Sequence, residues 1–382
     1  MRVDRVTEDR RIVERMTVHL GPRSYDIVLG RGLTDQFGHF VRQLLPHSGT
    51  ALLVADEHTQ KLTAPLSVPL KEAGFATVTV VVPAGEQSKS LEQLSRLYDA
   101  LYEMKADRRT PVIAVGGGVV GDLAGFAAAT YNRGLPLIMV PTTLLAMVDS
   151  SVGGKTAINH PRGKNLIGAF HQPKGVWIDT EHLETLPGRE YRSGLAEVVK
   201  YGVIRDPDLF ETLEHHVEAL LGGDKNLLPA VIARCCRIKA DIVEQDEYEE
   251  TGVRAILNYG HTFAHAFEVV GVADRWLHGE AVAAGMMCAV QLAQRIGFLE
   301  DASLLSRQQA LLEAFRLPTR PLSHWHVEAL LATMQRDKKA AAGRLRFVLP
   351  RRLGEVSLVD DVPPDEVRQL LGEQLSAAAE SS

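Results

Sequence analysis

The sequence is poor in cysteine. Its cysteines are Cys235, Cys236 and Cys288, which form neither a Cys-x-x-Cys pair nor an even set that could build a disulfide framework. This pattern excludes a secreted disulfide scaffold and indicates reduced, buried thiols of the kind found in cytoplasmic proteins.

Long apolar runs and an excess of positive charge are also missing. No stretch reaches the roughly 18 uninterrupted apolar residues that a membrane helix needs, and residues 1–15 contain no apolar run that could form a signal peptide. The formal net charge of -6 argues against nucleic acid or an anionic membrane as the principal partner. We therefore expect a cytoplasmic protein that binds neither nucleic acid nor membrane.

The apolar residues that are present follow two rhythms along the chain. In the first half, short runs rich in β-branched residues alternate with amphipathic stretches such as residues 90–104, which predicts strands separated by helices. The expected strands are residues 26–30, 51–55, 76–82, 112–115, 137–140 and 176–178. Such strands form a parallel sheet covered on both faces, which places ligand-binding residues after the carboxyl ends of the strands.

After about residue 187 the strand signals give way to long helical patterns. These lie at residues 191–204, 226–244, 260–270 and 279–295. A chain of 382 residues favours about two domains. We predict a flexible leader over residues 1–15, an α/β domain over 16–186, a helical domain over 187–375 and a frayed tail over 376–382.

A glycine cluster at residues 116–122 follows one predicted strand and opens a helix. Glycines at such a turn let backbone N–H groups approach a pyrophosphate, although tight strand–helix packing requires glycine as well. The G-x-G-x-x-G spacing after a first strand is absent, which disfavours an ordinary Rossmann dehydrogenase. Asp56, at the end of another predicted strand, suits a ribose hydroxyl and a helix N-cap equally well.

A loop-rich stretch combines Asp149, Lys155, Lys164 and Asn165 with several glycines and serines. It contains the end of a Walker A motif, but Asp149 stands where that motif needs its first glycine, which disfavours a nucleotide triphosphatase. Lysines on such a loop suit a phosphorylated substrate, and solvated surface lysines are the alternative.

Glu197, His261 and His278 are the candidate metal ligands, because one carboxylate and two imidazoles form a set typical of catalytic zinc sites. His265 shares a helical face with His261, and Lys200 shares one with Glu197. The zinc-protease motif is absent, since His261 is not followed by glutamate. Spacing alone supports a metal site and buried structural histidines about equally.

Taken together and in order, these segments strongly resemble the 3-dehydroquinate synthase family. The match spans roughly residues 20–370 and includes residues 116–125, 141–145, 148–156 and 163–168 besides the three candidate ligand segments. The resemblance implies an α/β fold, with an N-terminal parallel-sheet Rossmann-like NAD-binding domain and a C-terminal all-helical metal-binding domain.

The resemblance also implies the reaction. It is the shikimate-pathway conversion of 3-deoxy-D-arabino-heptulosonate 7-phosphate to 3-dehydroquinate and phosphate, with NAD and zinc as cofactors and cobalt as an alternative metal. The steps implied are transient oxidation by NAD, phosphate elimination, re-reduction, ring opening and aldol closure. A homodimer is implied too, with Arg133 reaching across the interface to the substrate phosphate.

The same resemblance assigns the site residues. It places the metal on Glu197, His261 and His278. It places NAD along Asp56, Glu86, Lys89, Gly118, Val119, Val120, Gly121, Asp122, Thr142, Thr143, Lys155, Lys164, His182, Leu183, Glu184 and Thr185. Around the substrate it places Arg133, Asp149, Lys155, Lys164, Asn165, Lys200, Arg254, Asn258, His265 and Lys339, with His265, Lys155, Asp149, Lys200 and Asn258 as catalytic residues.

Three other readings remain open at this point. Related sugar-phosphate cyclases act on sedoheptulose 7-phosphate or glucose 6-phosphate. A metal-dependent polyol dehydrogenase would use NAD as a true co-substrate, and an inactive relative would only bind a partner. Met147 and His58 depart from the family pattern, which expects glutamine and asparagine there, so they affect the expected NAD contacts.

Overall fold

A computed structural model describes residues 12–337 and 345–380. Its contacts divide the chain into two compact units. One runs to Pro187 and also includes Ile232–Tyr248, and the other comprises Gly188–Val231 and the chain from Glu249 onward. The structure therefore differs from the expected boundary between the two domains, because residues 232–248 pack with the first unit.

The first unit is built on a seven-stranded sheet of order β1-β2-β9-β6-β5-β3-β4. β1 pairs antiparallel with β2, and the other neighbouring strands pair in parallel. The strands are β1 (Ile12–Val18), β2 (Tyr25–Gly30), β3 (Thr50–Asp56), β4 (Ala76–Val82), β5 (Val112–Gly116), β6 (Leu137–Pro141) and β9 (Gly175–Asp179). Every strand expected from an apolar run is confirmed.

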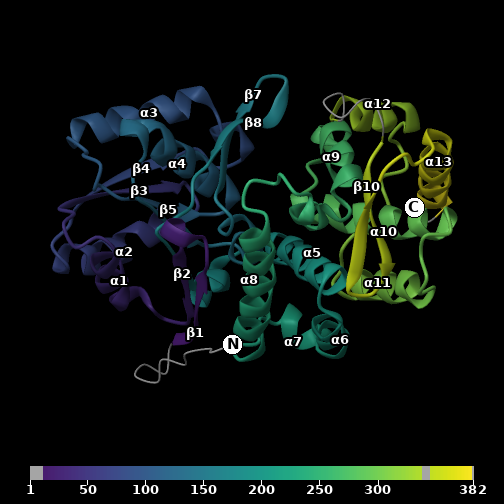
Figure 1. The fold of residues 1–382 in the computed structure, drawn as a ribbon, viewed down its shortest axis with the longest axis horizontal. Coiled ribbons are helices and arrows are strands. Elements are labelled where there is room, and N and C mark those ends of the chain that lie inside the picture. The colour runs from purple at the N-terminus through teal and green to yellow at the C-terminus, as the bar shows by residue number, and fades with distance from the viewer. Residues whose placement is uncertain (1–11, 338–344, 381–382) are drawn as a thin grey trace. The chain divides into compact units, whose positions relative to one another are not determined.

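Helices cover both faces of this sheet (Figure 1). On one face, α1 (Phe37–Leu44) and α2 (Gln60–Glu72) bury Phe37, Phe40 and Leu66 against the strands and Trp177. On the other lie α3 (Leu91–Glu103) and α4 (Gly118–Thr130). The expected parallel α/β architecture is confirmed.

Two elements of the first unit fall where no strand was expected. β1 begins at Ile12, inside the stretch predicted to be a flexible leader, because Met16 and Val18 alternate into the core while Arg15 is exposed. The hairpin of β7 (Lys155–His160) and β8 (Gly163–Phe170) occupies the stretch predicted to be loop-rich. Most β8 residues are exposed, so the hairpin has no apolar pattern to reveal it.

The second unit is mainly helical, as expected. Its helices are α5 (Gly188–Ile204), α6 (Pro207–His215), α7 (Val217–Leu221), α9 (His261–Val270), α10 (His278–Arg295), α11 (Ser303–Ala314), α12 (Val327–Asp337) and α13 (Pro364–Glu380). The antiparallel hairpin of β10 (Phe347–Arg352) and β11 (Glu355–Val359) is an addition to the all-helical expectation. α13 continues to Glu380, where a frayed tail was expected, because the run Ala377–Ala379 has high helix propensity.

α8 (Leu227–Gln245) begins in the second unit and continues into the first. In the first unit its side chains bind β1 and the neighbouring turns. Arg237 donates a hydrogen bond to the Thr17 carbonyl at 2.9 Å, and Glu244 accepts one from the His19 backbone at 2.9 Å. These bonds explain why the C-terminal part of α8 belongs to the sheet-containing unit.

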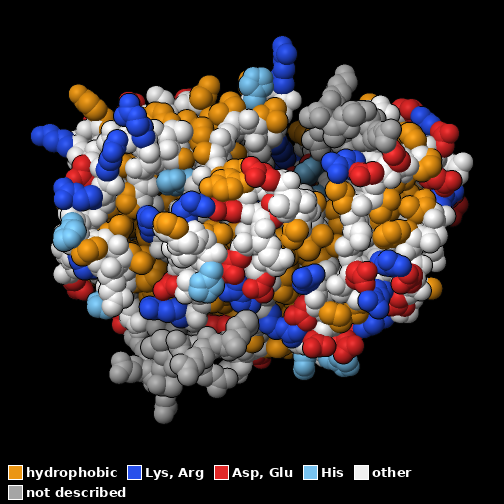
Figure 2. Space-filling view, viewed as in Figure 1, with side chains coloured by type: hydrophobic (Ala, Val, Ile, Leu, Met, Phe, Trp, Pro, Cys, Tyr) orange, Lys and Arg blue, Asp and Glu red, His pale blue; other side chains and the backbone are white. Residues whose placement is uncertain are grey.

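The described residues contain no helix that is long and apolar enough to cross a membrane. The face seen in Figure 2 carries acidic and basic side chains interspersed with one another, in keeping with the small net charge. Lys338 and Lys339, the latter an expected phosphate contact, lie outside the described residues.

Candidate active site

The residues expected to bind NAD gather at one edge of the sheet in the first unit. Asp56 ends β3, Glu86 and Lys89 follow β4, and residues 118–122 follow β5. Thr142 and Thr143 follow β6, and residues 182–185 follow β9. Because these strands are parallel, their carboxyl ends share an edge, and the strand order reverses between β3 and β5. A reversal of this kind opens the crevice in which α/β proteins bind ligands.

Asp56 holds the turn before α2 but is not its N-cap, which is Thr59. Asp56 Oδ1 accepts hydrogen bonds from the backbone N–H groups of His58 at 3.0 Å and Thr59 at 2.8 Å, and from the Thr59 hydroxyl at 2.9 Å. These bonds fix the turn that leads into α2. A contact from Asp56 to a ribose stays a prediction.

Packing accounts for part of the glycine cluster. A Cβ on Gly116 would lie 2.6 Å from the Val120 side chain, and one on Gly121 would lie 2.7 Å from Met139. The cluster also places the N-terminus of α4, whose first N–H groups suit an anion, directly after β5. Packing therefore explains Gly116 and Gly121, and phosphate binding at the start of α4 stays a prediction.

Three buried polar atoms at this edge have no hydrogen-bond partner within the described part of the chain. They are Thr142 Oγ1, Ser150 Oγ and His182 Nδ1. Burial lowers the pKa of His182, which keeps its ring neutral. Buried polar atoms are almost always hydrogen-bonded in folded proteins, so these three fit a site completed by a polar ligand.

Lys89 links two of the predicted binding segments. Its ammonium is buried and donates to Asp122 Oδ2 at 2.7 Å and to Asn165 Oδ1. The structure thus brings Asn165 beside predicted NAD residues, while the Lys155 and Lys164 side chains are exposed. Exposure is compatible with a phosphate contact and with a surface lysine, so the roles of Lys155 and Lys164 stay predictions.

Asp149 contacts a lysine that the sequence analysis did not single out. Asp149 lies in the π-helical turn Ala146–Ser150, and buried Lys239 from α8 binds its Oδ1 and, at 2.8 Å, its carbonyl. Lys239 interrupts the apolar stretch of α8 between Ile238 and Ala240. A buried lysine usually requires an acidic partner. A lysine within an apolar helical stretch was therefore the sequence signal that could have identified Lys239.

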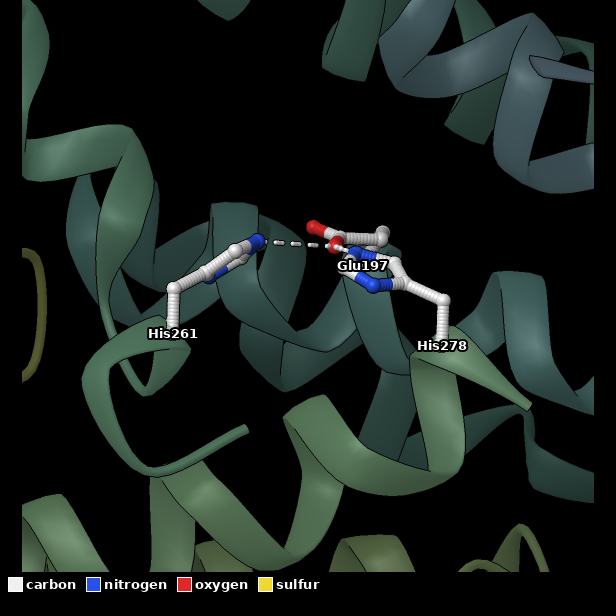
Figure 3. A group of neighbouring side chains, drawn as sticks. All are labelled: Glu197, His261 and His278. Atoms are coloured by element: carbon white, nitrogen blue, oxygen red, sulfur yellow. Dashed lines mark ion pairs between the residues drawn. The ribbon is translucent and has the colours of Figure 1, made fainter. Parts of the chain in front are cut away.

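The three candidate metal ligands come together in the second unit (Figure 3). Their ligand atoms all lie within 4.8 Å of one another. Glu197 Oε1 is 3.5 Å from His261 Nε2 and 3.3 Å from His278 Nε2. Glu197 is in the middle of α5, whereas His261 and His278 are the first residues of α9 and α10.

Close helix packing creates this convergence. Gly260 has a φ of +79°, and a Cβ there would lie 2.7 Å from the Met286 backbone, so only glycine lets α9 start against α10. Gly279 has no room for a Cβ because the Ser193 carbonyl is in the way, and its N–H donates to Ser193 Oγ at 3.0 Å. The glycines beside His261 and His278 therefore bring both imidazoles to α5.

The tautomer of His261 points to a cation at the centre of the cluster. Burial lowers the pKa of His261 to about 3, so the ring is neutral. Its Nδ1–H donates to the Tyr259 carbonyl at 3.1 Å, which leaves a lone pair on Nε2 facing the Glu197 carboxylate. Two acceptors facing each other repel, and a metal ion between them would relieve this repulsion.

Lys200 and Glu268 complete the electrostatics of the cluster. Lys200 Nζ lies 2.5 Å from Glu197 Oε2, and both side chains are buried, so Oε1 is the oxygen turned toward the imidazoles. Burial lowers the pKa of His278, but the Glu197 and Glu268 carboxylates outweigh it and raise this pKa to about 10. Glu268 Oε2 is 3.6 Å from His278 Nδ1 and was not singled out from the sequence, although it lies seven residues after His261 on α9.

The remaining predicted substrate residues lie in two places. Arg254, Asn258 and His265 belong to the second unit: Arg254 is buried, Asn258 and His265 are exposed, and the His265 ring lies 5.6 Å from that of His261. Arg133 is an exposed residue of the first unit, in the left-handed region at a φ of 66°.

The fold and the ligand set place the chain in a class of synthases whose solved members hold NAD+ with Zn2+ or Co2+. ValA, a 2-epi-5-epi-valiolone synthase from Streptomyces hygroscopicus subsp. jinggangensis solved with NAD+ and Zn2+, superposes with a TM-score of 0.83 at 28% identity, over 94% of this chain and 97% of ValA. A 2-deoxy-scyllo-inosose synthase complexed with carbaglucose-6-phosphate, NAD+ and Co2+ gives 0.85 at 25% identity, over 94% of this chain and 100% of that one.

Sequence comparisons show the family to which the chain belongs. Residues 79–193 match the 3-dehydroquinate synthase N-terminal family, and residues 194–340 match the C-terminal one. The 3-dehydroquinate synthase of Desulforamulus reducens is 49% identical over 357 residues, which cover 93% of this chain and 99% of that protein. The chain belongs to the 3-dehydroquinate synthase family.

Proposed function

We propose that the protein is a 3-dehydroquinate synthase, which converts 3-deoxy-D-arabino-heptulosonate 7-phosphate to 3-dehydroquinate and phosphate in the shikimate pathway. The observation that carries this proposal is the buried Glu197–His261–His278 cluster in a chain 49% identical to a 3-dehydroquinate synthase over 93% of its length. The cofactors are NAD and a divalent metal, zinc or cobalt.

Glu197, His261 and His278 would hold the metal. When bound, the metal supplies a Lewis acid for a substrate alcohol, and NAD supplies a reversible hydride acceptor, so that no net oxidation results. Lys200 holds Glu197 Oε2 and thereby orients Oε1, while the Tyr259 carbonyl holds the His261 Nδ1–H and orients Nε2. These contacts fix the ligand geometry in advance of binding.

NAD would bind at the carboxyl edge of the parallel sheet. Thr142 Oγ1 and His182 Nδ1 are buried polar atoms suited to ligand groups, and the N-terminus of α4 suits the pyrophosphate. The residues proposed for this contact are Asp56, Glu86, Lys89, residues 118–122, Thr142, Thr143, Lys155, Lys164 and residues 182–185.

The substrate carries a carboxylate and a phosphate, and the proposed contacts include cations for both. Arg254 and Lys200 are buried cations, whereas Lys155 and Lys164 are exposed on the β7–β8 hairpin. Asp149, Asn165, Asn258, His265 and Lys339 complete the proposed set. A ring nitrogen of His265 would relay the proton, because an imidazole can gain and lose one near neutral pH. Lys155, Asp149, Lys200 and Asn258 would orient the reacting groups.

We also propose that the protein is a cytoplasmic homodimer in which Arg133 reaches the partner's substrate phosphate. Arg133 is exposed, and Asn132 and Arg133 both adopt left-handed φ values, of 49° and 66°. Such strain outside glycine is concentrated at functional positions. All three cysteines are buried and unbridged, which supports a reducing compartment.

The proposal is tested by phosphate release from 3-deoxy-D-arabino-heptulosonate 7-phosphate with catalytic NAD and zinc. Sedoheptulose 7-phosphate and glucose 6-phosphate serve as comparison substrates. We expect release only from the first substrate, lost on chelation, restored by zinc and without accumulation of NADH. Stoichiometric NADH would instead indicate a dehydrogenase, and release from another sugar phosphate would reassign the substrate.

A further inference from the structure

The pairing of the β7–β8 hairpin becomes irregular at Asn159, where this single residue of β7 lies opposite three residues of β8, 164–166. The two strands pair in register from Lys155 to Ile158, and the register then shifts before His160 pairs with Gly163. The backbone N–H of Asn159 instead donates to the Lys89 carbonyl at 2.8 Å. The irregular pairing releases the backbone of Asn159 from the strand ladder, and its side chain takes part in a polar network.

Asn159 uses both ends of its amide in that network. Its Nδ2 donates to Glu86 Oε1 at 2.8 Å, and its Oδ1 accepts the backbone N–H of Asn165 at 2.8 Å. Only this orientation satisfies both partners, because a carboxylate needs a donor and an N–H needs an acceptor. Asn159 is therefore a fixed bridge between the turn after β4 and the start of β8.

The residues that Asn159 connects are proposed to contact different ligands of the reaction. Glu86 and Lys89 are proposed to contact NAD, and Asn165 is proposed to contact substrate. Lys89 closes the ring, since its ammonium donates to Asn165 Oδ1 and Asp122 and lies 3.6 Å from Glu86. Asn165 has a φ of 58°, a left-handed conformation that the hydrogen bond from its own N–H to Asn159 Oδ1 helps to hold.

We propose that Asn159 is a positioning residue that couples NAD binding at residues 86–89 to substrate binding at Asn165. The proposal rests on the proposed function and adds a residue that this function does not include. When NAD fixes Glu86, Asn159 holds Asn165 in its substrate-binding conformation, and the converse holds with equal strength because coupling between two bound ligands is reciprocal.

The test compares two NAD constants of the zinc-loaded, full-length enzyme. Calorimetry gives the Kd for NAD without substrate, and the NAD dependence of phosphate release at saturating substrate gives the second constant. Their ratio measures how much the substrate tightens NAD binding. We expect a ratio above one in the wild type and a ratio near one in N159A, which loses both hydrogen bonds.

The variants N159D and N159D/E86Q distinguish a loss of coupling from a general loss of structure. N159D keeps the acceptor for Asn165 but places a carboxylate against Glu86, so we expect NAD binding to weaken by about tenfold to a hundredfold. E86Q in the N159D background restores a donor–acceptor pair, so N159D/E86Q should recover NAD binding to the level of E86Q alone, the reference for the loss of the Glu86 charge. N226D, which makes the same change at an exposed asparagine, is the matched control.

The outcomes are distinct. An unchanged ratio in folded N159A, or no recovery in N159D/E86Q, would refute the coupling role even if kcat falls. Should N159A not fold, the N159D and N159D/E86Q pair decides alone. A wild-type enzyme that binds NAD but releases no phosphate would contradict the proposed function and not the bridge, because the direct NAD titrations of the N159D pair still report on the Glu86 contact.

Discussion

The two carboxylate oxygens of Glu197 face three neighbouring side chains, those of Lys200, His261 and His278. Lys200 takes Oε2, and both imidazoles face Oε1. The side chain is almost completely buried, and removing a carboxylate from water is costly unless cations or donors surround it. The position therefore tolerates neither a neutral isostere nor a shift of the chain.

We predict that E197Q lowers metal affinity by more than about 100-fold and nearly abolishes turnover, because the amide removes the ligand charge and the carboxylate that faces the buried Lys200. Competition with a chromogenic chelator measures the affinity. E211Q, an exposed change on α6, should match the wild type. Full activity of E197Q in metal-depleted buffer would disprove the metal assignment.

A second residue-scale prediction concerns pH. In the metal-free cluster the carboxylates raise the pKa of His278 to about 10, so the imidazole is protonated at pH 7 to 8. Metal binding must displace this proton, and affinity should therefore rise with pH, by about tenfold per unit, until pH passes the pKa. Calorimetry in two buffers of different ionisation enthalpy should show about one proton released per ion. No proton release would contradict the protonated state of His278 in the metal-free cluster.

At the scale of elements, the starts of α9 and α10 decide where the two imidazoles lie. The segment before α9 is anchored from α11: the Tyr259 hydroxyl donates to Gln308 Oε1 at 2.9 Å and lies 3.2 Å from the Met286 carbonyl. Tyr259 and Gln308 are both fully buried. The carbonyl of Tyr259 also accepts the hydrogen bond from His261 Nδ1. Tyr259 therefore both anchors the segment before α9 and fixes the tautomer of His261.

We predict that Y259F destabilises the fold by about 1–3 kcal/mol, because it leaves the Gln308 carbonyl oxygen buried without its donor. The double variant Y259F/Q308L, which removes both polar partners, should recover part of this loss. Urea unfolding measures both, and Y102F, at a tyrosine that is 77% exposed, is the control. A double variant less stable than Y259F would contradict this account.

Elements with continuous apolar runs were predictable from the sequence, and elements defined by long-range contacts were not. The central strands are buried on both faces, so their runs identify them within a residue. Residues 12–15 of β1 were mistaken for part of a leader, because Glu14 and Arg15 are charged and the buried Met16 and Val18 come only after them. The β7–β8 hairpin is largely exposed and has no apolar signature.

The site divides in the same way. Motif order identified Glu197, His261 and His278, and the structure brings them together. Lys239, Glu268 and Asn159 were missed because each contacts a residue on another element of the fold. Lys239 contacts Asp149 across 90 positions, and Asn159 contacts Glu86 across 73. Spacing within a single motif cannot reveal such pairs.

At the scale of the whole molecule, the proposed homodimer makes each active site depend on two chains. We predict that R133A and E197Q, each inactive alone, regain about a quarter of wild-type activity when unfolded together and refolded as a mixture. A hybrid dimer contains one site with an intact Glu197 and the partner's intact Arg133, and random mixing makes half of the dimers hybrids.

Phosphate release after mixing is the measurement, and sedimentation velocity establishes the dimer. E197Q mixed with K200A is the control, because both changes lie on the same helix of one subunit and cannot complement across an interface. If R133A with E197Q gains no more activity than this control, Arg133 does not act on the partner's site.

The division of α8 between the units has a consequence for synthesis of the chain. The first unit takes Ile232–Tyr248 as a structural part, with hydrogen bonds from α8 to the backbone of Thr17 and His19. When the ribosome has synthesised the chain only as far as Pro187, part of the first unit is still missing. Translation has to proceed through residues 188–231 of the second unit and on to Tyr248 before the first unit can close, so the nascent protein spends that interval in need of protection from aggregation.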